Sequence, residues 1–416
     1  MSGSSDSTID SVSALKRIQS VINRTPLQKN ARLSKKYGAS IYLKREDMQV
    51  VRSYKLRGAY NKISRLSEDE RAKGVVCASA GNHAQGFAFS CNNQKIKGVI
   101  FMPSHTPNQK IDQTRMFGGD FVEIVLVGDT FDDCLREALI YTEEHQMTFV
   151  PPFDDLAIIE GQGTVGVEIL EDLPDVDIVI VPIGGGGLAS GVGHYLHQTK
   201  PDTVCYGVEP LGAPSMKTAF SAKKPVTLDR INTFVDGAAV KKAGALTLGY
   251  CQKYIPRIEL VPEGKVCTTI LDLYNHEAIV AEPAGALTVA SLDIYADAIK
   301  GKKVVCIVSG GNNDFDRMAE IKELSLQYEG KKHYFLVNFP QRPGALRLFV
   351  TEVLGEHDDI TRFEFIKKTE RERGPALVGI ELMSPSDYAS LIDRMKEKRF
   401  DFKEINRDQT LFEYLI

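Results

Sequence analysis

Lys55 is the residue in this sequence best suited to covalent chemistry. It lies in the stretch 52–60, where Ser53 and Tyr54 precede a helical pattern. Apolar or aromatic residues then recur with the spacing of one helical face: Leu56, Tyr60, Ile63 and Leu66. Ser53 is placed to cap that helix. A helix N-terminus and burial both disfavour an ammonium group, and such a lysine suits Schiff-base formation. Taken alone, a lysine at a helix start is more often a solvated surface charge.

Four consecutive glycines follow a short apolar strand and precede a second helix. The loop consists of Gly184, Gly185, Gly186, Gly187 and Leu188. Residues without Cβ let several backbone N–H groups converge on one anion, and the helix N-terminus adds partial positive charge. The spacing is neither G-x-G-x-x-G nor a Walker loop, which disfavours a nucleotide polyphosphate. A tight turn needs fewer glycines, so we predict a site for a single phosphomonoester.

Two further strand ends carry polar groups. Ser309, in the sequence Ser-Gly-Gly-Asn, can bond a ring nitrogen. The other strand end opens a helix and offers free amides to an anion: Ser79, Ala80, Gly81, Asn82 and His83. We interpret His83 as a structural hydrogen bonder rather than an acid–base catalyst. An amine, an anion loop, a phosphate site and a ring partner together match one cofactor, pyridoxal 5′-phosphate (PLP).

The elements that must position these residues alternate between strand and helix. From about residue 14 to 320, short apolar runs are each followed by a helical pattern, for example 75–79, 99–102, 178–182 and 304–308. Such runs indicate parallel strands covered on both faces, so the fold class is α/β. Ligands in these folds bind beyond the carboxyl ends of the strands. That rule selects the loops 79–83, 184–188 and 309–312.

The composition is that of an ordinary globular protein, with 43% hydrophobic and 25% charged residues among 416. A net charge of −4 and the lack of a basic block disfavour nucleic acid as a partner. No apolar run approaches a membrane span, and residues 1–13 do not resemble a signal peptide. The seven scattered cysteines indicate buried, reduced thiols. We therefore expect a soluble, cytoplasmic protein.

The pattern changes near residue 330. The polar segment 322–332 is a plausible linker. The segments after it read as strand, helix, strand, strand, helix and strand, which is the split-βαβ, ferredoxin-like plan. They carry no catalytic constellation, and we interpret them as a binding or assembly module.

Five motifs in this order resemble the fold-type II PLP enzymes, and more narrowly the threonine dehydratases (threonine ammonia-lyases). The motifs are residues 53–59, 79–86, 184–188, 282–286 and 309–312. The resemblance implies a PLP-dependent catalytic domain at 1–321, with a smaller subdomain at roughly 56–155. After the linker at 322–332, residues 333–416 resemble one ACT-like regulatory domain of the biosynthetic, isoleucine-pathway form.

The resemblance also implies roles for individual residues. Lys55 would bind the cofactor aldehyde and, once displaced, remove the Cα proton of the substrate. Asn82 would bond the PLP 3′-hydroxyl, the loop 184–188 the phosphate and Ser309 the pyridine nitrogen. The backbone of 79–83 would hold the substrate carboxylate. Loss of the β-hydroxyl, protonated through the cofactor phosphate, would yield 2-oxobutanoate and ammonia.

The sequence departs from the family pattern at three places. Tyr54 stands where the family usually has Phe, and its hydroxyl needs a partner if it is buried. Ala80 stands where related serine racemases carry the serine that acts as second base. Glu209 and Ala213 match a cation site of those relatives, but Ser215 replaces its acidic ligand, so we predict no metal.

We expect L-threonine as substrate, with L-serine as a second substrate. Isoleucine is expected to inhibit by binding near Arg342, Gly344 and Ala345, and the resemblance suggests valine as an opposing activator and a homodimer or homotetramer. The alternatives are a catabolic serine/threonine dehydratase, a relative such as threonine synthase or a racemase, and a catalytically silent protein that senses an amino acid. The C-terminal module argues against the catabolic form, and the intact Lys55 argues against a silent protein.

Overall fold

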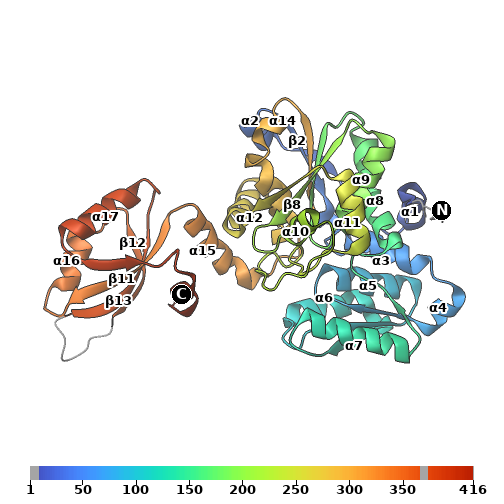
Figure 1. Cartoon of the computed structure of the whole chain (residues 1–416), viewed down its shortest axis with the longest axis horizontal. Coiled ribbons are helices and arrows are strands. Elements are labelled where there is room, and N and C mark those ends of the chain that lie inside the picture. The colour runs from blue at the N-terminus through green and yellow to red at the C-terminus, as the bar shows by residue number, and fades with distance from the viewer. Residues whose placement is uncertain (1–8, 366–372, 416) are drawn as a thin grey trace. The chain divides into compact units, whose positions relative to one another are not determined.

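The computed structural model describes residues 9–365 and 373–415, and the chain divides into two compact units (Figure 1). Unit 1 is Met1–Asp314 and unit 2 is Phe315–Ile416. The sequence had suggested a catalytic domain ending at 321 and a linker at 322–332. In the structure, helix α15 (Met318–Tyr328) spans the start of that linker and belongs to unit 2.

The larger sheet of unit 1 has six strands in the order β1-β2-β10-β7-β8-β9. In that order they are Leu27–Lys29, Ser40–Arg45, Lys303–Val308, Ile178–Pro182, Val204–Pro210 and Arg257–Val261. All neighbouring pairs are parallel except β1 with β2. The predicted parallel α/β sheet is therefore confirmed, with one antiparallel strand at its edge.

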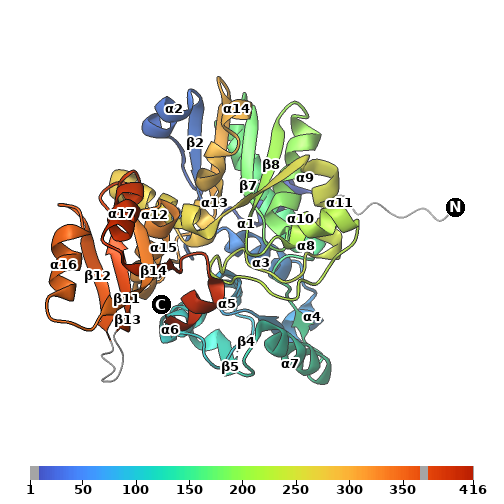
Figure 2. The same cartoon turned by 60° about the vertical axis from the view of Figure 1, so that its left-hand side comes forward.

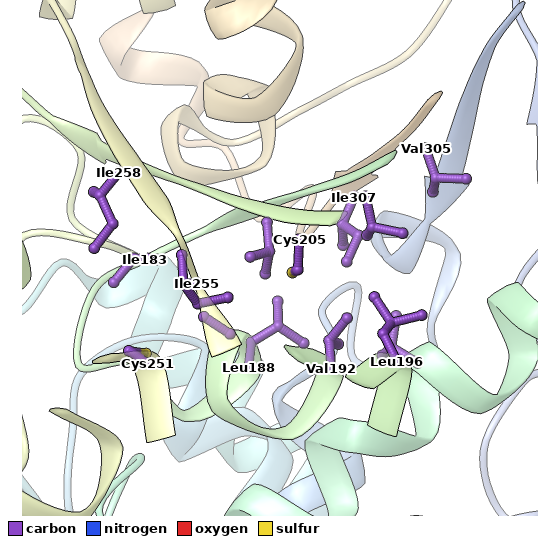
Figure 3. Packing of buried hydrophobic residues seen from close by; sticks show 14 of the residues in the cluster. Ile183, Leu188, Val192, Leu196, Cys205, Cys251, Ile255, Ile258, Val305 and Ile307 are labelled. Atoms are coloured by element: carbon purple, nitrogen blue, oxygen red, sulfur yellow. The ribbon is translucent and has the colours of Figure 1, made fainter. Parts of the chain in front are cut away.

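Helices cover both faces of this sheet. Figure 1 shows α8 (Leu156–Asp172), α9 (Gly187–Thr199) and α11 (Ala245–Tyr254) on one side and α12 (Glu263–Glu277) on the other. Leu188, Val192 and Leu196 recur every four residues along α9 and point at the sheet (Figure 3). There they meet Cys205, Val305 and Ile307 in a core from which water is excluded. This packing fixes the N-terminus of α9 beyond the end of β7.

The smaller sheet of unit 1 is fully parallel, in the order β5-β4-β3-β6. Its strands are Val122–Leu126, Gly98–Met102, Val75–Ala78 and Thr148–Phe149. Alternate residues of β3 pack on opposite faces: one face meets α5 (Asn82–Gln94) and α6 (Asn108–Gly118), the other α7 (Phe131–Glu144). Figure 2 shows the small sheet below the larger one, with α3 (Lys55–Ser64) close to both.

The remaining elements of unit 1 are short. They are α1 (Ser11–Ile18), α2 (Ala31–Tyr37), η1 (Glu46–Met48), α4 (Glu68–Lys73), η2 (Gly119–Phe121), α10 (Ser215–Ala222), α13 (Pro283–Ala290), η3 (Ser291–Asp293) and α14 (Ala296–Ile299). All seven cysteines are buried free thiols, as expected.

Unit 2 has the predicted strand and helix order after η4 (Phe315–Arg317) and α15. Its elements are β11 (Lys332–Pro340), α16 (Ala345–Glu352), β12 (Asp359–Phe365), β13 (Arg373–Glu381), α17 (Asp387–Glu397) and β14 (Asp401–Glu404), with α18 (Gln409–Leu415) at the end. The strands form an antiparallel sheet in the order β12-β13-β11-β14. Phe339, Phe349 and Phe400 meet edge to face in its core. The ferredoxin-like prediction is confirmed.

Candidate active site

A cavity of about 1260 Å³ lies in unit 1 between the two sheets. It is bordered by the loops that follow β3, β7 and β10, as the rule for parallel sheets predicts. Every residue that the sequence suggested for cofactor or substrate lines it: Lys55, Ser79, Ala80, Gly81, Asn82, His83, Gly184, Gly185, Gly186, Gly187, Leu188 and Ser309. The fold thus brings together groups that lie more than 200 residues apart in the chain.

Lys55 is the first residue of α3, but the expected cap is wrong. The N-cap is Tyr54, and no side chain caps the helix. Ser53 instead forms an isolated antiparallel bridge with Gly310, and its Oγ is buried without a hydrogen-bond partner in the described structure. The Tyr54 N–H donates to the Ser309 carbonyl at 3.2 Å. This short pairing, rather than a cap, places the lysine beside the end of β10.

The Lys55 ammonium group donates to the Pro152 carbonyl at 2.9 Å. Burial lowers the pKa of Lys55 to about 8, against the attraction of the Glu282 carboxylate. A nucleophilic, uncharged amine is therefore accessible near neutral pH. Burial, and then the charge of Lys55, also lower the pKa of His83 to about 3. His83 is neutral and donates from Nε2 to the Val150 carbonyl at 2.9 Å, as a structural hydrogen bonder would.

Two helices direct their N-termini at the cavity. Helix α5 begins after Gly81 and α9 after Gly186, and neither has a side-chain cap. Gly186 has φ +95°, a left-handed conformation that a side chain would strain. The first amides of each helix have no carbonyl partner within the helix and carry its partial positive charge. The cavity therefore offers two places for an anion.

Glu282 is the functional candidate to which the sequence reasoning gave no role. It is buried at the N-cap of α13, and the Asn82 amide donates to its Oε1 at 2.6 Å. The Asn312 amide donates in turn to Asn82 Oδ1 at 2.7 Å. Burial, then the charge of Asp236, raise the pKa of Glu282 to about 7. The sequence feature that could have pointed to Glu282 is an acidic residue directly before an apolar helix that begins with proline. The ordinary interpretation of such a residue is a solvated N-cap.

The rim of the cavity carries two ion pairs that no motif predicted. Lys110 lies 2.7 Å from Asp236, and Lys241 lies 3.5 Å from Asp132. Each pair joins the small subdomain to residues 223–244, an irregular segment that lines the cavity. Irregular segments have no periodicity, so no sequence pattern indicates their position.

At Glu209, where related serine racemases have a cation site, backbone N–H groups of the protein itself bind the carboxylate. Its carboxylate accepts the N–H groups of Met216 at 2.7 Å and Lys217 at 2.8 Å. Burial nevertheless raises the pKa of Glu209 to about 7. No group of three or more His, Cys, Asp or Glu residues suited to a metal ion is found in 9–365 and 373–415.

In unit 2, the turn expected to hold an effector precedes α16. Gly344 is the N-cap, with φ +83°, and no side chain caps the helix. Arg342 is exposed and Ala345 is buried. Beside them, Gln341 Nε2 is buried and has no hydrogen-bond partner among the described residues. A polar group left in this state costs free energy unless a ligand satisfies it.

Comparison with known proteins agrees with both units. Residues 18–310 match the family model described as pyridoxal-phosphate dependent enzyme. Residues 323–415 match the model for the C-terminal regulatory domain of threonine dehydratase. The chain is 55% identical over 408 residues to the biosynthetic L-threonine dehydratase IlvA of Halalkalibacterium halodurans, covering 98% of each chain. It is 57% identical over 404 residues to that of Bacillus subtilis, covering 97% of this chain and 96% of the relative.

Among solved structures, the processed form of threonine deaminase isoform 2 from Solanum lycopersicum is 40% identical, with a TM-score of 0.72. The match covers 78% of this chain and 94% of that structure. Fold, cavity and family model together define a PLP-dependent enzyme of fold type II with a C-terminal regulatory domain. The chain belongs to the biosynthetic L-threonine dehydratases. In the described part of the chain, no helix combines the length and apolar character that a membrane span requires.

Proposed function

We propose that this chain deaminates L-threonine to 2-oxobutanoate and ammonia by β-elimination of water, and accepts L-serine as a second substrate. The observation that carries the proposal is Lys55, an amine of lowered pKa in a cavity faced by two uncapped helix N-termini. These residues fit PLP, which needs an amine, a phosphate site and a partner for its ring. When bound, PLP supplies an aldehyde that condenses with amines and a ring that withdraws electrons from Cα.

The positions of the chain's own groups support one set of cofactor contacts. The amides of Gly184–Leu188, at the N-terminus of α9, would hold the phosphate. Ser309, buried at the end of β10 and lining the cavity, would bond the ring nitrogen. The Asn82 amide would bond the ring hydroxyl, and its hydrogen bond to Glu282 fixes the orientation of the Asn82 side chain. Lys55 would supply the amine that the cofactor aldehyde requires.

The substrate contacts use the second helix N-terminus. Of the amides expected at 79–83, that of Ser79 donates to the Phe101 carbonyl and that of Gly81 to Ser79 Oγ. The remaining amides at the start of α5 would bind the substrate carboxylate. This would orient Cα toward Lys55, whose nitrogen, once the substrate amine has displaced it from the cofactor, would remove the Cα proton. Ala80 offers no proton acceptor on the opposite face, so elimination is favoured over racemisation. The β-hydroxyl would then take up a proton at the phosphate end of the site and leave as water, and hydrolysis of the remaining enamine would give 2-oxobutanoate and ammonia.

The proposal has four direct tests. Purified protein is expected to show a visible absorption band that shifts when L-threonine is added. Borohydride reduction and peptide mapping should place a pyridoxyl label on Lys55, whereas an unlabelled Lys55 would exclude the mechanism. Lys55→Ala should abolish elimination and leave PLP weakly bound at the glycine loop.

A keto-acid assay with L-threonine and with L-serine measures which of the two substrates the enzyme prefers. A clear preference for L-serine would overturn the threonine assignment.

We also propose that isoleucine inhibits the enzyme by binding at the turn of Arg342, Gly344 and Ala345, with valine acting in opposition. The uncapped start of α16 and the unpartnered Gln341 amide support this site. Deletion of residues 333–416 is the test. A truncated enzyme that isoleucine still inhibits as before would contradict the assignment.

We further propose that the enzyme is a cytoplasmic homodimer or homotetramer. Exposed apolar side chains on unit 1, among them Met48, Tyr274 and Val280, are candidates for an interface between subunits. Light scattering of the purified protein measures the assembly, and a monomeric mass would contradict this proposal.

A further inference from the structure

A short turn, Pro152–Phe153–Asp154, lies between the lysine and the glycine loop. Its first carbonyl accepts the Lys55 ammonium group, as described above. The ring of Phe153 packs against Gly185 so closely that a Cβ on that glycine would lie 2.1 Å from ring atom Cδ1. The turn therefore contacts both ends of the proposed cofactor site.

Asp154 connects this turn to a helix some 90 residues further along the chain. Its carboxylate accepts the N–H groups of Ala245 at 2.9 Å, Leu246 at 3.0 Å and Thr247 at 3.1 Å. These are the first amides of α11, whose own N-cap, Gly244, has no side chain to offer. A Cβ on Gly244 would lie 2.3 Å from Asp154 Oδ1, so the glycine makes room for the carboxylate. Asp154 thus supplies the cap that the sequence around α11 lacks.

Thr247, in the first turn of α11, extends the connection to the glycine loop. It is fully buried, and its hydroxyl donates to the Gly185 carbonyl at 2.6 Å. The peptide that joins Gly185 to Gly186 is planar and trans, so its C=O and N–H point in opposite directions. A peptide between two glycines rotates at little steric cost. The Thr247 hydroxyl therefore selects one orientation of a peptide that is otherwise free to flip.

We propose that Thr247 and Asp154 are positioning residues for the phosphate-binding loop. Asp154 fixes the start of α11, and Thr247 holds the Gly185 carbonyl away from the anion, so that the Gly186 amide is directed the other way before the ligand arrives. The proposal rests on the proposed role of Gly184–Leu188 in binding the PLP phosphate. Donors that are oriented in advance bind an anion more tightly than donors that must reorganise.

The test compares Thr247→Val, which keeps the shape and removes the donor, with Thr247→Ser, which keeps the donor. PLP is titrated into the apoprotein, and the dissociation constant is read from the visible absorption. One buried hydrogen bond corresponds to about a five- to tenfold change in affinity. We expect Thr247→Val to weaken PLP binding by that factor and Thr247→Ser to stay within about twofold of the parent. At saturating PLP, kcat of the valine variant should recover.

The matched control is Thr203→Val, which removes another buried hydroxyl that donates to a backbone carbonyl, that of Val176 at 2.9 Å. It should lower the thermal stability of the apoprotein as Thr247→Val does but leave PLP affinity unchanged. Asp154→Ala should weaken PLP binding in the same direction as Thr247→Val.

Two results overturn the inference while leaving the proposed function intact. One is a Thr247→Val protein that binds PLP like the parent. The other is an equal loss of affinity in the serine, valine and Thr203 variants, which would indicate a purely structural effect. A parent protein that takes up no PLP would instead refute the proposed function, and the inference with it.

Discussion

At the scale of single residues, the cavity is lined by a base and an acid whose pKa values are shifted toward each other. Lys55 has its pKa lowered to about 8, and Glu282 has its pKa raised to about 7. Burial is the largest cause of both shifts. Each group is therefore more costly in its charged form in the fold than in the unfolded chain, and the apoprotein gives up stability to keep them there.

Replacing Lys55 by Met should abolish activity and stabilise the apoprotein at pH 7. The folded-state pKa of Lys55 lies below the unfolded value of 10.5. The buried ammonium group therefore lowers the free energy of unfolding of the parent by its full amount below pH 8, and this loss of stability disappears as the pH rises to 10.5. The gain of Lys55→Met should be about 1 to 3 kcal/mol at pH 7, since one pKa unit corresponds to about 1.4 kcal/mol. Urea denaturation of both apoproteins across this pH range measures it. A variant less stable than the parent at pH 7 would contradict the argument.

Replacing Glu282 by Gln should also stabilise the apoprotein, but in another pH range. The folded-state pKa of Glu282 lies above the unfolded value of 4.5. The buried carboxylate therefore begins to lower the free energy of unfolding of the parent between pH 4.5 and 7, and this loss of stability is complete above pH 7. We expect a gain of about 1 to 3 kcal/mol at pH 8 that vanishes near pH 4.5. Thermal or urea unfolding as a function of pH is the measurement.

Glu168→Gln provides the control of opposite sign. Burial alone would raise the pKa of Glu168, but Arg57 and Lys44 outweigh it and lower the pKa. This substitution should therefore destabilise the apoprotein above pH 4.5. If Glu168→Gln and Glu282→Gln changed the free energy of unfolding equally across this pH range, burial alone would govern the pKa of both carboxyl groups.

At the scale of elements, the helix that starts with Lys55 is anchored by a buried charge cluster. Arg57 bonds Glu46 of η1 at 2.8 Å and Glu168 of α8 at 2.7 Å. Lys44 of β2 lies 2.6 Å from Glu168, and all four side chains are almost completely buried. The cluster joins α3 to the large sheet and to α8, and so fixes the position of the lysine two residues away.

Arg57→Met should destabilise the apoprotein by about 3 to 5 kcal/mol, because it leaves Glu46 with its charge unpaired in the interior. Equilibrium urea denaturation measures the loss. Arg24→Met is the control, since the Arg24 side chain is 52% exposed and its ion pairs with Glu171 and Asp172 should contribute less than about 1 kcal/mol. Similar losses in the two variants would rule out a special role for the buried cluster.

How far the sequence could predict these features depends on the range of the interactions. The alternation of apolar strands and helices is local, and it was sufficient to predict the parallel sheets and the loops at their ends. The bridge between Ser53 and Gly310 overrode a plausible helix cap, and it joins residues 257 positions apart. The charge cluster, the network of Glu282 and the clamp of Asp154 on α11 are equally non-local. A single sequence carries no signal for such pairs, because each partner taken alone looks like a solvated polar residue.

At the scale of the whole molecule, the active-site loop continues along the chain into the regulatory unit. Ser309 and Asn312 line the cavity, and η4 and α15 follow directly. Within unit 2, α15 is attached to the first strand of the regulatory sheet: Glu323 accepts the Tyr334 hydroxyl at 2.8 Å and lies 3.8 Å from the Lys332 ammonium group. A rearrangement of β11 on effector binding would therefore move α15, and through the chain the residues just after Ser309.

Tyr334→Phe should uncouple regulation from catalysis. Without isoleucine, its rate with L-threonine should stay within about twofold of the parent, because Tyr334 lies outside the cavity. For isoleucine, the effector proposed above, the concentration for half inhibition should rise about three- to tenfold, as expected for the loss of one hydrogen bond to a carboxylate from a coupled network. Tyr388→Phe is the control, since it removes a similar bond of 2.8 Å to Glu404 that does not involve α15. Equal shifts in both variants would mean that the sheet as a whole, and not its attachment to α15, carries the signal.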